Sequence, residues 1–272
     1  MNFSSRRAVG LAVAFFLIGD VALPQELENF PKLQWFEQHK DEFDIVFVGS
    51  SRIYHGVSPK LFDQITAQSG HHWRSFNLGK DGMVQGECLA VVRQIVALHP
   101  QKLRYVFFEI QGSGTSIPKR AAERANSKPL SYAGRYGGLG PDGDGYFPMG
   151  KSMTPAVQER YRGFLKAAQE SPDPHPADSS ARETLGHFCE ELGSENVRII
   201  FVEAPSLRSA HGSSVNAPAG IPLFSFSDTV RYAALYDEKN RMDAEHLNAR
   251  GAEVFSRALA NEFVAMLDSR TR

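Results

Sequence analysis

The chain has 272 residues, of which 42% are hydrophobic and 22% are charged, so it can bury a large core, and these values exclude a globally disordered protein. Lysine and arginine together number 30, against 31 aspartates and glutamates. Because there is no basic excess to neutralise a phosphate backbone, this balance argues against a nucleic-acid-binding protein.

Residues 1–24 have the pattern of a signal or a membrane anchor. Arg6 and Arg7 precede an uncharged run over residues 8–19, and Asp20 follows it. The run is shorter than the ~20 residues that span a bilayer, and no clean A-x-A cleavage site follows it. We therefore favour an uncleaved signal-anchor or membrane helix over a cleaved signal peptide, with a helix packed on the domain as a third alternative. The positive-inside rule then places the rest of the chain on the non-cytoplasmic, periplasmic side, membrane-anchored or secreted.

Residues 25–43 predict a connecting segment with a helix, and the first strand follows. The run 45–48 is apolar and mostly β-branched or aromatic, which is typical of a strand buried on both faces. It ends directly in Gly49-Ser50-Ser51. Ligands bind at the carboxyl ends of the strands in an open parallel sheet. These serines therefore either cap a turn or carry out chemistry at that edge.

Helices and strands alternate along the rest of the chain. The order β-α-β-α-β with short links argues for a parallel sheet with right-handed crossovers, within one domain over residues 44–269. Residues 111–151 lack periodicity and form a candidate lid or substrate wall. The predicted helices cover residues 58–69, 86–98, 154–169, 180–192 and 248–267, and the four predicted strands cover residues 45–48, 73–78, 103–110 and 197–202. Residues 204–245 are expected to be largely loop, with a short element of open type at 223–226.

Cysteine and histidine patterns indicate no metal site. Neither cysteine has C-x-x-C spacing. His71 and His72 adjoin at a strand start, where their side chains would point in opposite directions. Cys88 and Cys189 each lie among apolar residues of a predicted helix, so we expect buried thiols, while a disulfide stays open.

Asp243 and His246 stand just before the last predicted helix, three positions apart. At this spacing two side chains lie on the same side of a helical turn, so the carboxylate can accept the imidazole Nδ1–H and leave Nε2 free to take a proton. A serine hydroxyl needs such a base because it is barely nucleophilic at neutral pH. By itself the pair also fits an ordinary helix N-terminus, which favours acidic residues. Together with Ser51, it predicts a catalytic triad at one rim of the sheet.

Four sequence blocks, in order, resemble those of the SGNH (GDSL-type) hydrolase superfamily. They are Gly49-Ser50-Ser51, NLGKDG at 77–82, FFEIQ at 107–111 and DAEHLN at 243–248. The resemblance covers residues 44–267. It is strongest to membrane-tethered members with Gly-Ser-Ser in place of Gly-Asp-Ser, some of which act on O-acyl groups of cell-envelope polysaccharides, among them alginate O-acetylation proteins. It implies a flavodoxin-like three-layer α/β/α sandwich with a parallel sheet, the SGNH hydrolase fold, preceded here by an N-terminal apolar helix.

The resemblance also implies the roles of the site residues. Ser51 would be the nucleophile, His246 the general base and acid, and Asp243 the residue that orients the imidazole. The backbone N–H groups of Ser51 and Gly82 would donate into an oxyanion hole, where negative charge develops in the transition state.

One block departs from the family pattern. The third block usually supplies an Asn side chain as an oxyanion donor, and no Asn directly follows the third predicted strand here. Gln111 is the nearest amide, with Ser113 and Thr115 as weaker substitutes. Either the donor has been replaced or the hole is incomplete. Arg52, beside the nucleophile, would either bind an acidic sugar or lie with its stem along apolar surface.

These observations predict a serine esterase or acyltransferase that works through an acyl-serine intermediate. Its substrate would be an O-acyl, chiefly acetyl, group of a cell-envelope glycan or a similar ester, with no cofactor. Water or a sugar hydroxyl would complete the reaction, and the sequence leaves hydrolysis and transfer open. The expected partners are an O-acylated carbohydrate or small ester, the membrane, and a membrane-bound acyltransferase. The alternative, which the missing Asn favours, is a catalytically inactive SGNH-like protein that binds glycan or serves in assembly.

Overall fold

The computed structural model describes residues 30–111, 138–150, 152–170, 179–193, 197–207 and 217–270. The predicted signal-anchor at 1–24 and most of the predicted excursion at 111–151 lie outside these ranges. Within them, none of the helices combines the length and apolar character that a bilayer crossing requires.

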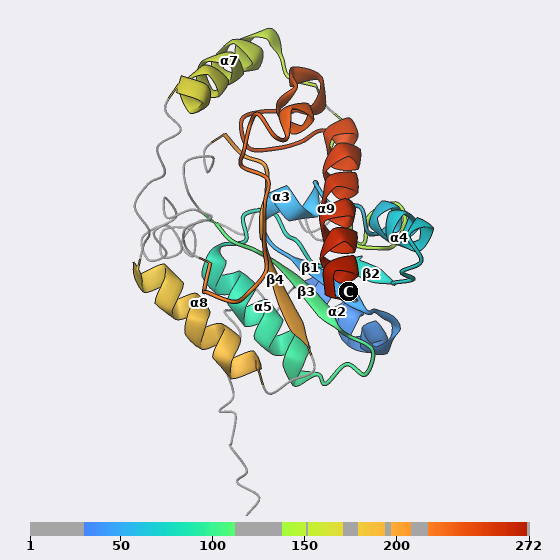
Figure 1. Ribbon diagram of the computed structural model, residues 1–272. Coiled ribbons are helices and arrows are strands. Elements are labelled where there is room, and N and C mark those ends of the chain that lie inside the picture. Colours follow the sequence, from blue (N-terminus) through green and yellow to red (C-terminus); the bar gives the residue numbers. More distant parts are fainter. Residues whose placement is uncertain are drawn as a thin grey trace, which may run out of the picture.

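A five-stranded, all-parallel sheet with the strand order β2-β1-β3-β4-β5 forms the centre of the fold (Figure 1). The chain order reverses between β1 and β3, and it is at such a switch point that open α/β sheets bind ligands. All of β1 is fully buried, as its continuous apolar run predicts. The strands are β1 Ile45–Val48, β2 Ser75–Asn77, β3 Tyr105–Glu109, β4 Arg198–Glu203 and β5 Leu223–Ser225.

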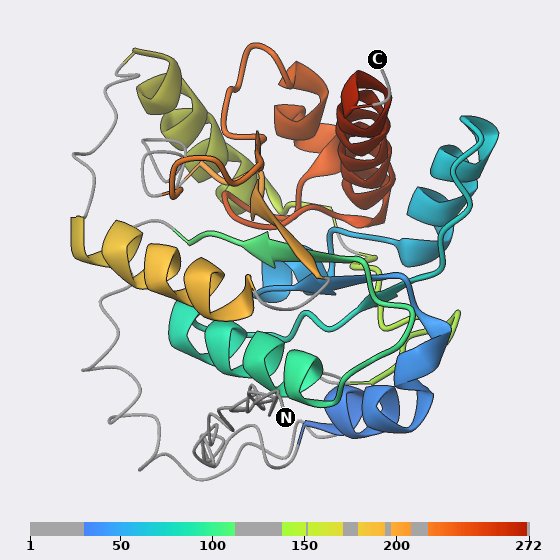
Figure 2. The ribbon, with the colours of Figure 1, turned by 60° about the horizontal axis from the view of Figure 1, so that its bottom comes forward.

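Helices cover both faces of the sheet (Figures 1 and 2). One face packs against α2, α5 and α8, and the other against α4, α7 and α9, so that each face has its own hydrophobic core. Alternation along β1 serves both cores, since Val46 and Val48 enter the first and Ile45 and Phe47 the second. The helices are α2 Pro31–His39, α3 Ser51–Tyr54, α4 Pro59–Gln68, α5 Gln85–Ala97, α7 Pro155–Glu170, α8 Ser179–Leu192 and α9 Ala249–Arg270. Three 3₁₀ segments add η1 Lys40–Glu42, η3 Ala233–Tyr236 and η4 Glu238–Asn240.

Helix α4 begins as its sequence predicts. The Ser58 hydroxyl accepts the Leu61 N–H, and Pro59 occupies the first helical position. Gly70, two residues past the last helical one, has φ of 84°, the left-handed conformation that glycine tolerates.

The packing of α9 on α4 returns the end of the chain to β1. The Ser58 N–H donates to Ser256 Oγ of α9 at 2.9 Å, and the rings of Phe62 and Phe263 stack at 5.7 Å between centroids. The segment that directly precedes α9 is thereby brought to the carboxyl end of β1, although it lies almost two hundred positions along the chain.

Both cysteines are free thiols, as expected for a structural role. Cys88 is completely buried, and burial raises the pKa of its thiol well above the usual value. Burial also raises the pKa of Cys189, to about 11. Both thiols are therefore protonated, and hence poor nucleophiles, at neutral pH.

Candidate active site

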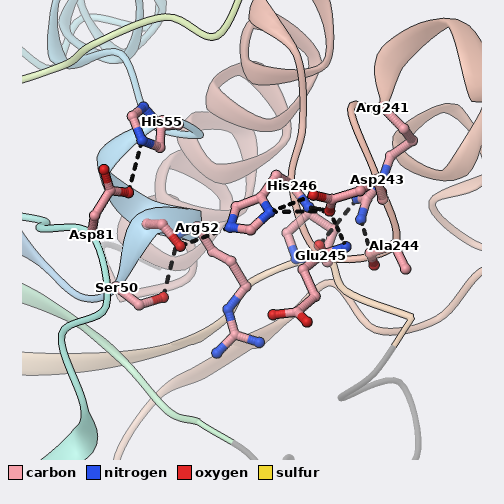
Figure 3. A network of polar contacts seen from close by, with 11 residues as sticks. Ser50, Arg52, His55, Asp81, Arg241, Asp243, Ala244, Glu245 and His246 are labelled. Atoms are coloured by element: carbon pink, nitrogen blue, oxygen red, sulfur yellow. Dashed lines mark hydrogen bonds and ion pairs between the residues drawn. The ribbon is translucent and has the colours of Figure 1, made fainter. Parts of the chain in front are cut away.

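Ser51, His246 and Asp243 meet at the carboxyl end of β1. Ser51 Oγ lies 2.8 Å from Nε2 of His246. The other ring nitrogen, Nδ1, lies 3.0 Å from each carboxylate oxygen of Asp243 (Figure 3). A carboxylate can only accept, so Nδ1 carries the proton and Nε2 is left to accept the Ser51 hydroxyl. The three predicted residues therefore have the connectivity of a serine nucleophile, its base and the group that orients that base.

A short helix positions the nucleophile. Ser51 is the first residue of α3, and Ser50 caps this helix by accepting the Arg52 N–H at 3.3 Å. Gly49 makes the turn from β1 into α3 possible because a Cβ there would lie 2.4 Å from Ile53 Cγ1 and 2.7 Å from Glu109 Oε2. Glycine is thus required because α3 and β3 leave no room for a Cβ, and not because the backbone is left-handed.

Asp243 organises the turn that carries the imidazole. Its Oδ1 accepts the N–H groups of Glu245 and His246 at 2.7 and 2.8 Å, while Met242 N–H donates to the His246 carbonyl at 2.9 Å. Burial by itself raises the pKa of Asp243, but the His246 ring and these two backbone N–H groups outweigh it and lower the pKa to about 2. The carboxylate is consequently ionised at neutral pH.

A buried arginine, which was not predicted from the sequence, lies under this turn. Arg241 is completely buried and donates to the carbonyl oxygens of Asp243 at 3.2 Å and Ala244 at 2.8 Å (Figure 3). It also donates to the carbonyl of Pro205 at 3.1 Å, and the ring of Tyr236 lies 5.7 Å from its guanidinium carbon. The residues near Arg241 in the sequence give no sign that it is buried, because its acceptors are backbone carbonyls from separate segments.

Two backbone N–H groups, those of Ser51 and Gly82, were predicted to form an oxyanion hole. Neither the Ser51 N–H nor the Gly82 N–H donates to another residue in the described ranges. The loop that carries Gly82 is held beside the nucleophile, because Lys80 N–H donates to the Gly49 carbonyl at 3.0 Å. Asp81 Oδ1 adds a second link, 2.9 Å from Nε2 of the buried His55 in the segment that follows α3.

Asn77 and Lys32 brace the start of this loop. The Asn77 amide donates to the carbonyls of Ile53 and Val57 at 2.8 and 2.7 Å, and its oxygen accepts the Gly79 N–H. The Lys32 ammonium is fully buried, and it donates to the carbonyls of Asn77 at 3.1 Å and of Gly79. Desolvation lowers the pKa of Lys32 well below the usual value. The role of these two residues in holding the loop was not predicted from the sequence.

The side-chain amide of Gln111 contacts core residues. Its side-chain nitrogen donates to the Met83 carbonyl at 2.9 Å and has Cys88 Sγ at 3.9 Å, so its two N–H groups are already directed into the core. This geometry gives no support to the prediction that Gln111 replaces the missing Asn. The weaker substitutes, Ser113 and Thr115, lie outside the described residues.

Arg52 has an acidic partner that was not predicted from the sequence. Its Nε donates to Oε1 of Glu109 at 2.7 Å, and the two side chains are 13% and 0% exposed. The other oxygen of Glu109 accepts the Ser50 N–H at 2.6 Å. A single acidic residue at the end of an otherwise apolar strand could have drawn attention to Glu109, which also lies within the third resemblance block.

The described residues contain no group of three His, Cys, Asp or Glu side chains that could hold a metal ion. Two surface hollows, of about 650 Å³ beside Tyr236 and about 240 Å³ beside Cys189, are lined by residues other than the triad. The triad, the two backbone donors and the Arg52–Glu109 pair therefore make up the candidate active site, at the edge of the sheet where parallel strands end. Comparisons with protein-family models, with curated proteins and with solved structures found no match for this chain.

Proposed function

We propose that the protein is a serine esterase or acyltransferase of the SGNH type. It works through an acyl-Ser51 intermediate on O-acyl, chiefly acetyl, groups of a cell-envelope glycan or a similar ester. The observation that carries this proposal is the hydrogen-bonded chain from Ser51 Oγ through His246 to Asp243, with separations of 2.8 and 3.0 Å. Such separations suit direct proton transfer between a nucleophile and its base.

In the acylation step, Ser51 Oγ attacks the carbonyl carbon of the ester while Nε2 of His246 takes the hydroxyl proton. Asp243 keeps the ring oriented and stabilises the positive charge that develops on it. The carbonyl oxygen becomes an oxyanion, which the N–H groups of Ser51 and Gly82 are placed to receive. Cleavage of the carbon–oxygen bond then releases the alcohol, which takes the proton from Nε2 and leaves the acyl group on Ser51.

Deacylation uses the same groups in reverse. Nε2 of His246 removes a proton from a second nucleophile, which attacks the carbonyl carbon of the acyl-enzyme. The bond between this carbon and Ser51 Oγ then breaks, and Oγ takes the proton back from Nε2. Water gives a free carboxylic acid, whereas a sugar hydroxyl gives a new ester. The proposal covers both outcomes, since one triad performs them and only the acceptor differs.

The sheet supports the assignment to the SGNH fold. Its strand order, 2-1-3-4-5, is that of flavodoxin-like sheets. Three of the resemblance blocks adjoin in space, since Glu109 contacts the Ser50 turn and Lys80 of the second block contacts Gly49. The block that contains Asp243 and His246 completes the set through Ser51.

The cellular setting is proposed from the sequence of residues 1–24. The chain would be held by this segment at the membrane or secreted, with the domain on the periplasmic side. Its partners would then be O-acylated glycans and a membrane-bound acyltransferase.

Turnover of an acetyl ester such as p-nitrophenyl acetate tests the proposal. We expect Ser51→Ala and His246→Ala each to lower kcat/KM by at least about 10³-fold, because nucleophile and base act as a unit. His71→Ala is the matched control, since His71 also faces a carboxylate, that of Asp268 at 3.2 Å, but far from Ser51 in the fold. Wild-type turnover by His246→Ala would rule out the triad. A folded wild-type protein without turnover would favour the inactive, glycan-binding alternative.

A further inference from the structure

We propose that Glu109 and Arg52 form one buried, charge-neutral unit that positions the nucleophile turn. In this account Arg52 is a positioning residue that acts through Glu109, and it does not recognise a charge on the substrate. The inference rests on the proposed function, since it assigns these side chains to the reaction of Ser51.

The contacts of Glu109 reach both sides of the nucleophile. One carboxylate oxygen accepts the Ser50 N–H at 2.6 Å and the other accepts Arg52 Nε at 2.7 Å. The residues immediately before and after Ser51 are thus tied to a single side chain. Bonds that involve an ionised partner are shorter and about twice as strong as neutral ones, so this carboxylate fixes the direction in which the Ser51 side chain leaves the backbone.

The backbone around Glu109 makes this arrangement rigid. Val48 and Phe108 are direct neighbours in the parallel β1–β3 ladder, so that Gly49 and Glu109 are the next residues along each strand. A Cβ on Gly49 would come within 2.7 Å of both Cβ and Oε2 of Glu109. The turn and the carboxylate consequently fit together with no space between them.

Charge explains why the carboxylate needs an arginine. Glu109 is fully buried, and an isolated carboxylate in such a place is costly. Its negative charge would also oppose the oxyanion that forms at the neighbouring Ser51, because screening by solvent is weak for buried groups. Arg52, only 13% exposed, supplies the compensating charge at hydrogen-bond distance. Removal of Arg52 alone therefore leaves an uncompensated anion beside the reacting atoms, whereas removal of both charges does not.

The test is a double-mutant cycle on a neutral acetyl ester, with Arg52→Gln, Glu109→Gln and the double variant. We expect Arg52→Gln to lower kcat about 10- to 100-fold with KM within about threefold of the wild type, because a buried charge loses its partner. The kcat of the double variant should be at least about tenfold higher than that of Arg52→Gln. A double variant as impaired as Arg52→Gln, or an Arg52→Gln variant that raises KM for anionic esters alone, would overturn the proposal.

Glu203 provides a matched control. It is the buried last residue of β4, as Glu109 is of β3, but its carboxylate accepts from the hydroxyls of Ser225 and Ser227. Glu203→Gln should leave kcat within about twofold of the wild type, since β3 lies between β4 and the strand that leads into the nucleophile turn and the contacts of Glu203 are made to β5 and the residues after it.

A second readout separates this inference from the proposed function. Hydrogen exchange of the Ser50 amide should be at least about fivefold faster in Glu109→Gln than in wild type, because a charge-assisted bond becomes a neutral one. Glu203→Gln should leave that exchange unchanged. If the wild type lacks turnover and this acceleration is seen, the proposed function fails and the positioning role stands. An unchanged Ser50 exchange in Glu109→Gln would refute the role whether or not the protein is active.

Discussion

Asp243 shows how one carboxylate can serve both the fold and the proposed chemistry. Oδ1, one of the two oxygens near Nδ1 of His246, also accepts two N–H groups of its own turn. The side chain that orients the imidazole therefore also shapes the backbone that carries His246. Such a carboxylate is held in place before any substrate arrives, which is the condition for efficient general base catalysis.

The lowered pKa of Asp243 predicts a pH dependence of stability. Its folded value of about 2 lies below the ~3.9 of an unfolded aspartate, so the ionised form stabilises the fold fully above about pH 4, and this contribution is lost as the pH falls through about 2. Wild type should therefore exceed Asp243→Asn in free energy of unfolding at neutral pH. The difference should shrink between about pH 4 and about pH 2. It is modest, since the side chain is 38% exposed and solvent screens it.

Urea unfolding of both proteins over this range measures the difference. Asp228→Asn is a suitable comparison because Asp228 accepts the N–H groups of Val230 and Arg231 without a histidine partner. A difference between wild type and Asp243→Asn that stays constant down to about pH 2 would contradict the role given to the ionised Asp243 carboxylate.

The sequence predicted the triad but not the residues that support it. Ser51 and the Asp243–His246 pair are recognisable because a strand end and a three-residue spacing are local features. Glu109 and Arg241 act through backbone groups contributed by distant segments, which no local pattern encodes. The acceptor of the Gln111 amide, the Met83 carbonyl, likewise comes from a distant segment, so the sequence could not foresee this contact.

At the level of elements, the β1–α3 turn depends on the absence of a side chain at Gly49. We expect Gly49→Ala to lower the free energy of unfolding by about 1–3 kcal/mol, the usual cost of overpacking, and to reduce turnover through displacement of Ser51. Gly163→Ala, in α7 with nothing near its missing Cβ, should instead raise stability by about 0.5–1 kcal/mol through helix propensity. Equal effects of the two substitutions in chemical unfolding would contradict the packing argument.

Arg241 connects η3, the segment after β4 and the turn that carries Asp243 and His246. Arg241→Lys should destabilise the protein by about 1–3 kcal/mol and lower kcat, because a lysine ammonium cannot reproduce the planar guanidinium, whose N–H groups donate to several separate carbonyls. Arg257→Lys, at an exposed position of α9, should change neither quantity appreciably. The account would be wrong if Arg241→Lys kept wild-type kcat and thermal stability.

Element boundaries were less predictable than element types. The strands predicted at 73–78 and 103–110 are shorter, at Ser75–Asn77 and Tyr105–Glu109, because buried apolar residues also occur just outside them, at Leu78, Leu103 and Ile110. The helical turn of α3 was not predicted, since four residues are too few for a periodic signal.

For the molecule as a whole, alternation of strands and helices was sufficient to predict a parallel sheet with covered faces. It could not give the strand order, which depends on where each crossover returns. The return of α9 to α4 is what closes the site, and this contact joins segments far apart in the sequence. The predicted signal-anchor lies outside the described residues and stays a prediction.

Fractionation of cells that express the full chain tests that anchor. The charge pattern of residues 1–24 predicts a membrane-associated protein whose domain is reached by added protease only from the non-cytoplasmic side. Replacement of Arg6 and Arg7 by glutamate should weaken this orientation. Recovery of the intact chain entirely in the cytosolic fraction would contradict the placement.

Labelling by a fluorophosphonate most directly tests the central claim, that His246 and Asp243 turn the Ser51 hydroxyl into a nucleophile. This reagent forms a covalent bond with an activated serine and can be located by mass spectrometry of the labelled peptide. We expect the adduct on Ser51 in folded wild-type protein, its absence in Ser51→Ala, and labelling slowed by at least about 10²-fold in His246→Ala. Folded wild-type protein that stays unlabelled, or an adduct that survives the Ser51→Ala substitution, would contradict the account.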